Sequence, residues 1–128
     1  MNHRLALGLT LLAGVAIGAF AVNSLNAQGK PPGAYAVVDI SEIMDQKTFD
    51  QIPAKATPAS LEALGGKYVI RTNNLTSLDG TAPKRLVVIA FDSVEKAKAW
   101  NNSPVQKEIN DLRNKSTKSR VFIADGAM

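Results

Sequence analysis

The chain of 128 residues contains no cysteine and a single histidine, His3. Without thiols no disulfide forms, so the fold must be held together by packing or by association with another chain. Zinc, haem and blue-copper sites usually draw on cysteine or histidine, so we expect neither a metal nor another bound cofactor. Serine or cysteine nucleophiles that need a histidine base are likewise excluded from the part of the chain that follows His3.

Phosphate-binding glycine patterns are also missing. Gly65-Gly66 ends a helical segment instead of opening one, so neither a Walker loop nor a dinucleotide fingerprint is present. Aromatic residues make up only 5% of the chain, and no basic stripe with interleaved aromatics occurs, so we expect no nucleic-acid partner. Of the 15 lysines and arginines only Arg4 lies in the first 27 residues, which leaves 14 against 11 acidic residues, a net charge of +3.

The first 27 residues resemble an export signal. Arg4 supplies a positive charge, and Leu5–Val22 is an uninterrupted apolar run of 18 residues, which is typical of a secretory signal peptide. Cleavage after Ala21 or after Ala27 fits this pattern, and we favour Ala27 because polarity begins at Gln28. The alternative is an uncleaved anchor, since the run is just long enough to begin spanning a bilayer; it would be the only membrane contact. We expect an exported protein, in a bacterial periplasm.

The rest of the chain has the size of one domain. Residues 28–33, QGKPPG, are rich in proline and glycine and predict a flexible linker before a domain at 34–126. Alternating or continuously apolar segments predict four strands, at Ala34–Ile40, Lys67–Arg71, Arg85–Phe91 and Ser119–Ala124.

Capping residues predict the helices. Asp45 is placed to cap a helix from Gln46, which Pro53 and Pro58 should kink or break before it resumes over Ser60–Leu64. Beyond the third strand, a second helical region begins after Asp92 or Ser93. Its first segment has Val94, Ala97 and Trp100 facing inward, and a segment that starts at Ser103-Pro104 carries Val105, Ile109 and Leu112.

The order β-α-β-β-α-β predicts an α+β, ferredoxin-like fold, with a four-stranded antiparallel sheet and the helices on one face. Arg85–Phe91 is apolar on both of its sides. The face of the sheet without helices would therefore expose a hydrophobic patch, and such patches mark interfaces. We expect a homodimer that buries sheet against sheet.

Several segments together carry a family resemblance: GGKYVIR at 65–71, RLVVIAF at 85–91, AKAW at 97–100 with Ser103-Pro104, and SRVFI at 119–123 followed by Gly126. Over residues 35–126 the chain resembles the domain-of-unknown-function 1330 family. The resemblance implies a dimeric α+β barrel of the ferredoxin-like class, often exported in bacteria, with no established general activity. The family commonly has glutamate at Ala90 and often tyrosine at Asn101 and Gln106, so no acid/base role is expected at these positions.

Five residues are candidates for a ligand site. Arg71 and Arg113 each present the paired donors that fit a carboxylate, although a surface ion pair would explain either one. Trp100, Tyr35 and Tyr68 are expected to line an apolar pocket between sheet and helices, unless they serve only as core packing. No residue is assigned a catalytic role.

Two functions of different classes fit these observations. The first, which we favour, is a non-catalytic dimer that binds a small acidic or aromatic molecule in a cleft of each protomer. The second is a cofactor-independent enzyme, oxygenase-like or isomerase-like, in which geometry and a few polar groups hold a reactive substrate. Binding is favoured because the chain has few acid/base residues. Binding of a ligand without its turnover would separate the two.

Overall fold

The structure, a computed structural model, describes residues 31–127. The elements follow in the order β1 (Ala34–Ile43), α2 (Gln46–Phe49), α3 (Pro58–Glu62), β2 (Lys67–Thr72), β3 (Arg85–Phe91), α4 (Val94–Asn101), α5 (Pro104–Ser116) and β4 (Thr117–Asp125). The expected signal at 1–27 and the first half of the expected linker, residues 28–30, lie outside the described residues. Within 31–127, no helix has the length and apolar character needed to cross a membrane.

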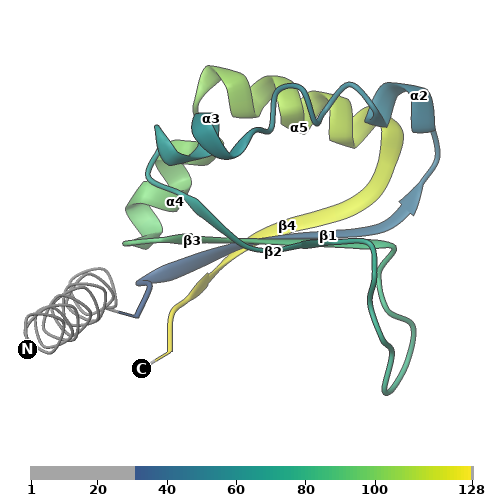
Figure 1. The fold of residues 1–128 in the computed structure, drawn as a ribbon, viewed down its shortest axis with the longest axis horizontal. Coiled ribbons are helices and arrows are strands. Elements are labelled where there is room, and N and C mark those ends of the chain that lie inside the picture. The colour runs from purple at the N-terminus through teal and green to yellow at the C-terminus, as the bar shows by residue number, and fades with distance from the viewer. Residues whose placement is uncertain (1–30, 128) are drawn as a thin grey trace, which may run out of the picture. The chain divides into compact units, whose positions relative to one another are not determined.

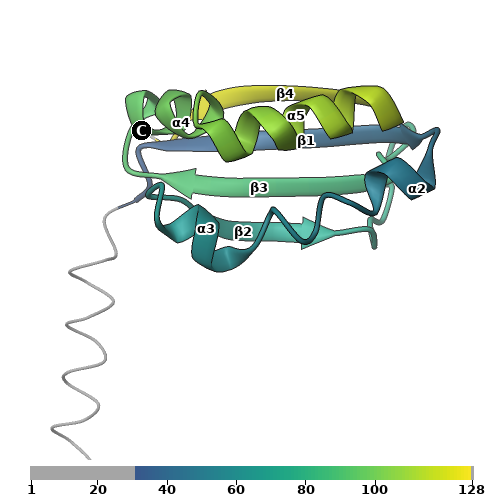
Figure 2. The ribbon, with the colours of Figure 1, turned by 90° about the horizontal axis from the view of Figure 1, so that it is seen from above.

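The strands form one four-stranded antiparallel sheet in the order β2-β3-β1-β4. The helices of residues 31–127 all cover the same face of this sheet, and the opposite face carries none of them (Figure 1 and Figure 2). Both central strands, β1 and β3, lie between neighbours, which suits their apolar sequences. The expected ferredoxin-like α+β fold is confirmed.

The core lies between the sheet and the helices. Ala36 of β1 and Ile89 of β3 are paired across the strands and are both buried beneath the helix layer. Phe91 and Trp100 complete this core with ring centroids 5.5 Å apart. Because side chains alternate along a strand, Tyr35 points to the other face of the sheet.

The expected break in the first helical region is confirmed, but the restart was placed too late. Asp45 caps α2, accepting a hydrogen bond of 3.1 Å from the Thr48 amide. Helix α3 begins at Pro58 and not at Ser60, with Thr57 as its N-cap. The reason is that proline at the first position of a helix loses no hydrogen bond, so Pro58 starts the helix instead of interrupting it.

Helix α5 turns a different stripe to the interior than the sequence predicted. Of the expected Val105, Ile109 and Leu112, only Ile109 is buried; the other two are half-buried. The buried residues of α5 are Gln106, Ile109, Arg113 and Ser116. Gln106 and Ser116 find hydrogen-bond partners on this buried stripe, as buried polar groups normally do. Arg113 donates one hydrogen bond there, from Nη1 to Asn110 Oδ1.

Candidate functional site

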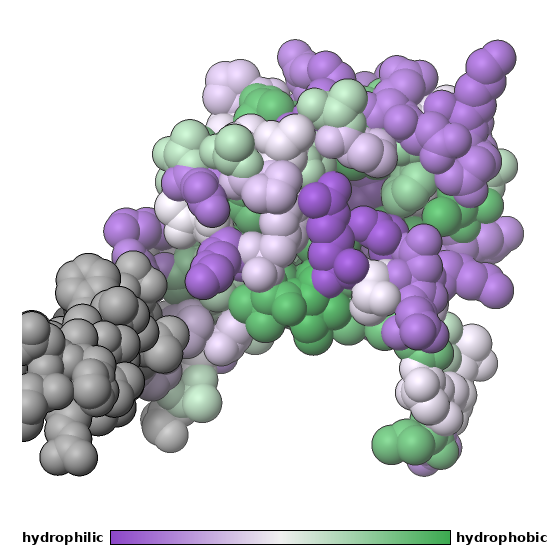
Figure 3. All heavy atoms as spheres, viewed as in Figure 1, coloured by the Kyte–Doolittle hydropathy of each residue, from purple (hydrophilic) through white to green (hydrophobic). Residues whose placement is uncertain are grey.

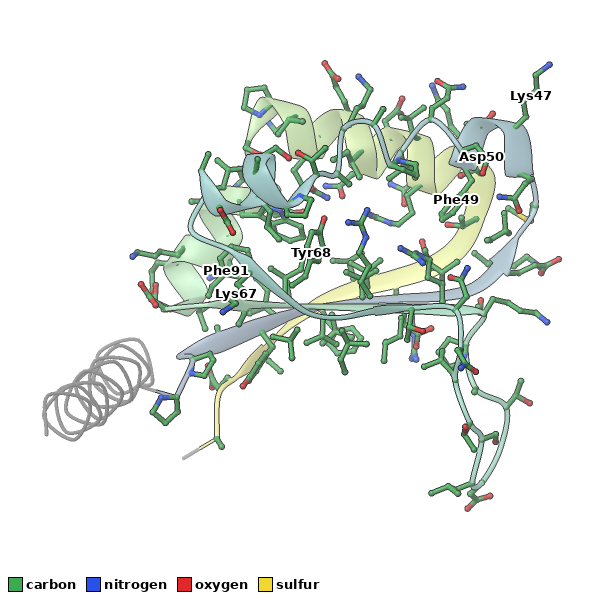
Figure 4. The ribbon with its side chains drawn as sticks, in the orientation of Figure 1. Lys47, Phe49, Asp50, Lys67, Tyr68 and Phe91 are labelled. Carbon is green, nitrogen blue, oxygen red and sulfur yellow. The ribbon has the colours of Figure 1, made fainter. Side chains whose placement is uncertain are left out.

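A cleft lies between the sheet and the helix layer. Its volume is about 80 Å³, several times the roughly 10–15 Å³ that one ordered water requires. Apolar side chains from both layers form most of its wall, among them Ile40, Phe49, Ile52, Val87, Ile89 and Ile109. Tyr68 rises from β2 toward the helices in this space (Figure 4). The cleft is therefore a small, mostly apolar chamber with a few polar groups.

Three arginines also line the cleft: Arg71 from β2, Arg85 from β3 and Arg113 from α5. No aspartate or glutamate of residues 31–127 is among the lining residues. No ion pair within the same residues joins any of the three arginines to a carboxylate. The cleft thus concentrates three positive charges without a counter-charge from the described protein.

Arg113 is the most deeply buried of the three, with 7% of its surface exposed. Its Nη1 donates to Asn110 Oδ1 at 2.7 Å, whereas its buried Nε has no hydrogen-bond partner among residues 31–127. Burial lowers the pKa of the Arg113 guanidinium, but an arginine keeps its proton at neutral pH. Within residues 31–127, Arg113 is therefore a buried cation whose side-chain hydrogen-bond acceptor is a neutral amide.

A chain of amides holds Arg113 in place. Asn110 Oδ1 also accepts from Gln106 Nε2 at 2.9 Å, and Asn110 Nδ2 donates to Asn101 Oδ1 at 2.9 Å. Asn101 and Gln106 stand at the two positions where the resembling family often has tyrosine. Here they form a polar network around an arginine, which fits binding of an anion better than proton transfer.

Arg71 and Arg85 form the second positive group of the cleft. Arg71 Nη2 donates to the Ala56 carbonyl at 3.0 Å, and its guanidinium carbon lies 4.6 Å from the centre of the Tyr68 ring. Arg85 Nη1 donates to Asn73 Oδ1 at 2.7 Å. Burial, and secondarily the positive charge of Arg71, lower the pKa of Arg85. The two guanidinium groups thus repel each other, and an anion between them would relieve that repulsion.

Tyr68 connects the sheet to the irregular segment that follows α2. Its hydroxyl donates to the Ala56 carbonyl at 3.1 Å, the same oxygen that Arg71 uses. Burial raises the pKa of Tyr68, an effect that the charges of Arg71 and Arg85 partly oppose. Lys55 Nζ pairs with Glu108 Oε2 at 2.9 Å and ties the same segment to α5. These contacts fix residues 50–57 beside the cleft.

The structure brings together four of the five residues proposed from the sequence, since Arg71, Trp100, Arg113 and Tyr68 all line the cleft. The placement of Tyr35 was wrong. Tyr35 lies opposite Ala90 and Ala124 of the neighbouring strands, on the face of the sheet that carries no helices. Because its neighbours Ala34 and Ala36 face the helices, the alternation of the strand directs Tyr35 away from the cleft.

Sequence reasoning missed Arg85 and Gln106. Arg85 has the same parity in β3 as Val87 and Ile89, which lie on the helix side, so the alternation of the strand was a usable signal. Gln106 gave no such signal, because a glutamine on a helix is ordinarily solvent-exposed. Residues 31–127 contain no group of three or more histidines, cysteines or acidic residues placed to hold a metal ion.

The face of the sheet away from the helices, called the open face below, is partly apolar. Ile70 and Phe122 are 39% and 46% exposed on it, and Leu86 and Val88 of β3 are half-buried there. Figure 3 shows hydrophobic side chains gathered on this underside of the sheet. An ion pair, Arg120 Nη2 to Asp39 Oδ2 at 2.7 Å, lies on the same face.

Comparisons with known proteins support the fold. A family model described as a domain of unknown function (DUF1330) matches residues 33–127. The chain is 14% identical to RPA0582, a protein of unknown function from Rhodopseudomonas palustris, with a TM-score of 0.56; the match covers 77% of this chain and 85% of that one. For the crystal structure of methylated RPA0582 the identity is 16%, the coverage 84% and 91%, and the TM-score 0.56.

A dimeric protein of unknown function with a ferredoxin-like fold, from Bacteroides fragilis, is 10% identical, with coverage of 75% and 99% and a TM-score of 0.49. No curated protein matches the chain. At these identities the structural likeness shows the fold alone.

Proposed function

The chain belongs to the DUF1330 family, whose description states no activity, and on that premise we propose that the protein binds a small carboxylate in the cleft. The observation that carries the proposal is the set of three arginines facing a cleft that no acidic residue of 31–127 lines. A guanidinium presents paired donors in a fixed plane, the geometry that a carboxylate accepts in bidentate form.

The burial of Arg113 supports an anion as the ligand. An uncompensated charge taken out of water costs several kcal/mol, and protein folds normally avoid that cost by pairing the charge. Only 7% of the surface of Arg113 is exposed, yet no carboxylate within residues 31–127 forms an ion pair with it. A ligand carboxylate would supply the missing counter-charge, so the cost of burying Arg113 would be recovered on binding.

The walls of the cleft restrict the rest of the ligand. Ile52, Val87 and Ile109 offer an apolar surface, and Trp100 adds an aromatic one. Ligand sites typically combine such walls with a few convergent polar groups. The volume of about 80 Å³ suits a short aliphatic carboxylate, since a closed cavity that holds benzene measures about 150 Å³.

A panel of acetate, butyrate, succinate and benzoate, each compared with its uncharged amide, tests the proposal by thermal shift and titration calorimetry. We expect at least one carboxylate, and no amide, to raise the melting temperature. Arg71→Gln should raise the dissociation constant of that carboxylate by about tenfold to a hundredfold, since a hydrogen bond to a charged group contributes about 1.5–3 kcal/mol. No stabilisation by any carboxylate would refute the proposal.

Arg120→Gln is the matched control for that substitution. Arg120 lies in the same sheet as Arg71, but its side chain is on the open face, where it is paired with Asp39. Its loss should leave the affinity for the carboxylate within twofold of the original value. Consumption of the bound carboxylate, followed by NMR, would instead support the alternative, a cofactor-independent enzyme of the oxygenase or isomerase type.

We also propose that the protein is a homodimer in which two open faces pack against each other. Support comes from the apolar side chains that a single protomer leaves exposed there, Ile70 and Phe122. A two-fold axis would place the same patch on both subunits and would cover both copies at once. β3, apolar on both of its sides, would then be shielded on both.

Phe122→Asp should convert the protein to monomers at micromolar concentration. The substitution puts an unpaired carboxylate from each subunit into the interface, and we expect the dissociation constant to rise by more than about a hundredfold. Sedimentation velocity measures this change. Ala59→Asp adds the same charge at an exposed site of α3, on the helix side, and should leave the dimer intact. If the unsubstituted protein sediments as a monomer at micromolar concentration, the proposed dimer is overturned.

A further inference from the structure

The connection between β2 and β3, residues 73–84, projects from the sheet on the side of the open face (Figure 1). We call this connection the arm. Leu78 in the arm is 97% exposed, the highest value among the exposed large hydrophobic residues of 31–127. Leu78 buries almost none of its apolar surface within the described protomer, so that surface is free to be buried against a partner.

The base of the arm is attached to the sheet by specific hydrogen bonds. Arg85 Nη1 donates to Asn73 Oδ1 at 2.7 Å, and the Lys84 amide donates to the Ile40 carbonyl at 2.8 Å. Within the arm, the Ser77 hydroxyl donates to the Gly80 carbonyl, and Gly80 has a φ of 74°, which a glycine adopts without strain. The arm is therefore directed away from the sheet by its own contacts.

We propose that the arm clasps the second copy of the chain and that Leu78 packs on the partner subunit. This inference rests on the face-to-face dimer proposed above. Two sheets that pack face to face lie about 10 Å apart. Six residues, half of the arm, extend up to about 20 Å. The arm is therefore long enough to pass the plane of the partner's sheet and to lie along its edge.

The direction and charge of the arm favour a second copy over other occupants. The arm leaves the sheet on the same side as Ile70 and Phe122, so whatever covers that apolar face also meets the arm. The arm contains one acidic residue, Asp79, and one basic residue, Lys84. Attachment to an anionic lipid surface depends on clusters of basic residues, which the arm lacks.

The dissociation constant of the dimer tests the clasp, measured by sedimentation with the protein expressed as the full 128-residue chain. Leu78→Asp should raise that constant by at least about tenfold, because each subunit loses one buried leucine and gains a charge. The melting temperature of the monomer should not change, since Leu78 is 97% exposed and its side chain does not pack within the protomer. Ala59→Asp is the charge-matched control and should leave the constant unchanged.

The outcomes separate the clasp from the dimer itself. A loss of affinity with Leu78→Asp but not with Ala59→Asp supports the clasp. An unchanged constant for Leu78→Asp, together with dissociation by Phe122→Asp, overturns the clasp and leaves the face-to-face dimer standing. If the unsubstituted protein is monomeric at micromolar concentration, both the clasp and the face-to-face dimer are overturned. Carboxylate binding in the cleft is measured independently of either.

Discussion

Replacing Trp100 with alanine is expected to lower the free energy of unfolding by about 3–5 kcal/mol, as large-to-small changes of buried tryptophan generally do. Trp100 is 3% exposed and packs against Phe91 with ring centroids 5.5 Å apart. The substitution leaves a cavity between α4 and the sheet that neighbouring side chains fill only in part. Because domains of this size are stable by about 5–15 kcal/mol, the variant should unfold at markedly lower urea concentration.

The measurement is urea denaturation at one fixed protein concentration, since association of subunits contributes to apparent stability. Trp100→Phe keeps an aromatic ring next to Phe91 and should recover most of the loss. Lys98→Ala, at an exposed position of the same helix, should change stability by less than about 0.5 kcal/mol. A loss below about 1 kcal/mol for Trp100→Ala would contradict the core described here.

Arg113→Met is expected to have the opposite sign and to raise the stability of the ligand-free protein by about 1–4 kcal/mol. Replacement of buried charges by apolar side chains of similar volume is often stabilising to this extent. Arg113 is a favourable case because its Nε has no partner in the described part of the chain and its hydrogen-bond acceptor, Asn110, is uncharged. The same variant should lose all stabilisation by carboxylates, because the buried counter-charge is gone.

Denaturation with and without the carboxylate selected from the panel measures both effects. Lys107→Met makes the same apolar change at an exposed position of α5 and should alter neither stability nor binding. A loss of more than about 1 kcal/mol for Arg113→Met would mean that the arginine is needed to hold α5 in place. That result would remove the support that the burial of Arg113 gives to an anion in the cleft.

The difference between these two variants follows from the kind of burial each residue has. Trp100 is buried among side chains that it contacts favourably, so its removal costs stability. Arg113 is buried with its Nε unpaired within residues 31–127 and with an uncharged acceptor at Nη1, so its removal relieves the ligand-free protein. A binding site that is less stable than an apolar substitute is an ordinary consequence of preparing charge for a ligand.

Local patterns in the sequence were sufficient to locate the strands and three of the four helix starts of residues 31–127. The apolar run of Arg85–Phe91 was predicted with the bounds that the structure gives β3. Asp45 and Ser103 mark helix starts because their side chains accept hydrogen bonds from amides of the first turn. Where local rules competed, as at Pro58, a proline was read as a helix breaker although it begins a helix.

By itself, the sequence determined the order of the elements, the ferredoxin-like fold and the resemblance to the DUF1330 family, because these depend on periodicity and on short motifs within a few residues. Tertiary structure alone decided which side of β1 the helices cover, and so removed Tyr35 from the site. It also brought Arg71, Arg85 and Arg113 to one cleft from two strands and a helix. Convergence of this kind depends on strand pairing and on the rotation of α5 about its axis, which no local pattern of residues specifies.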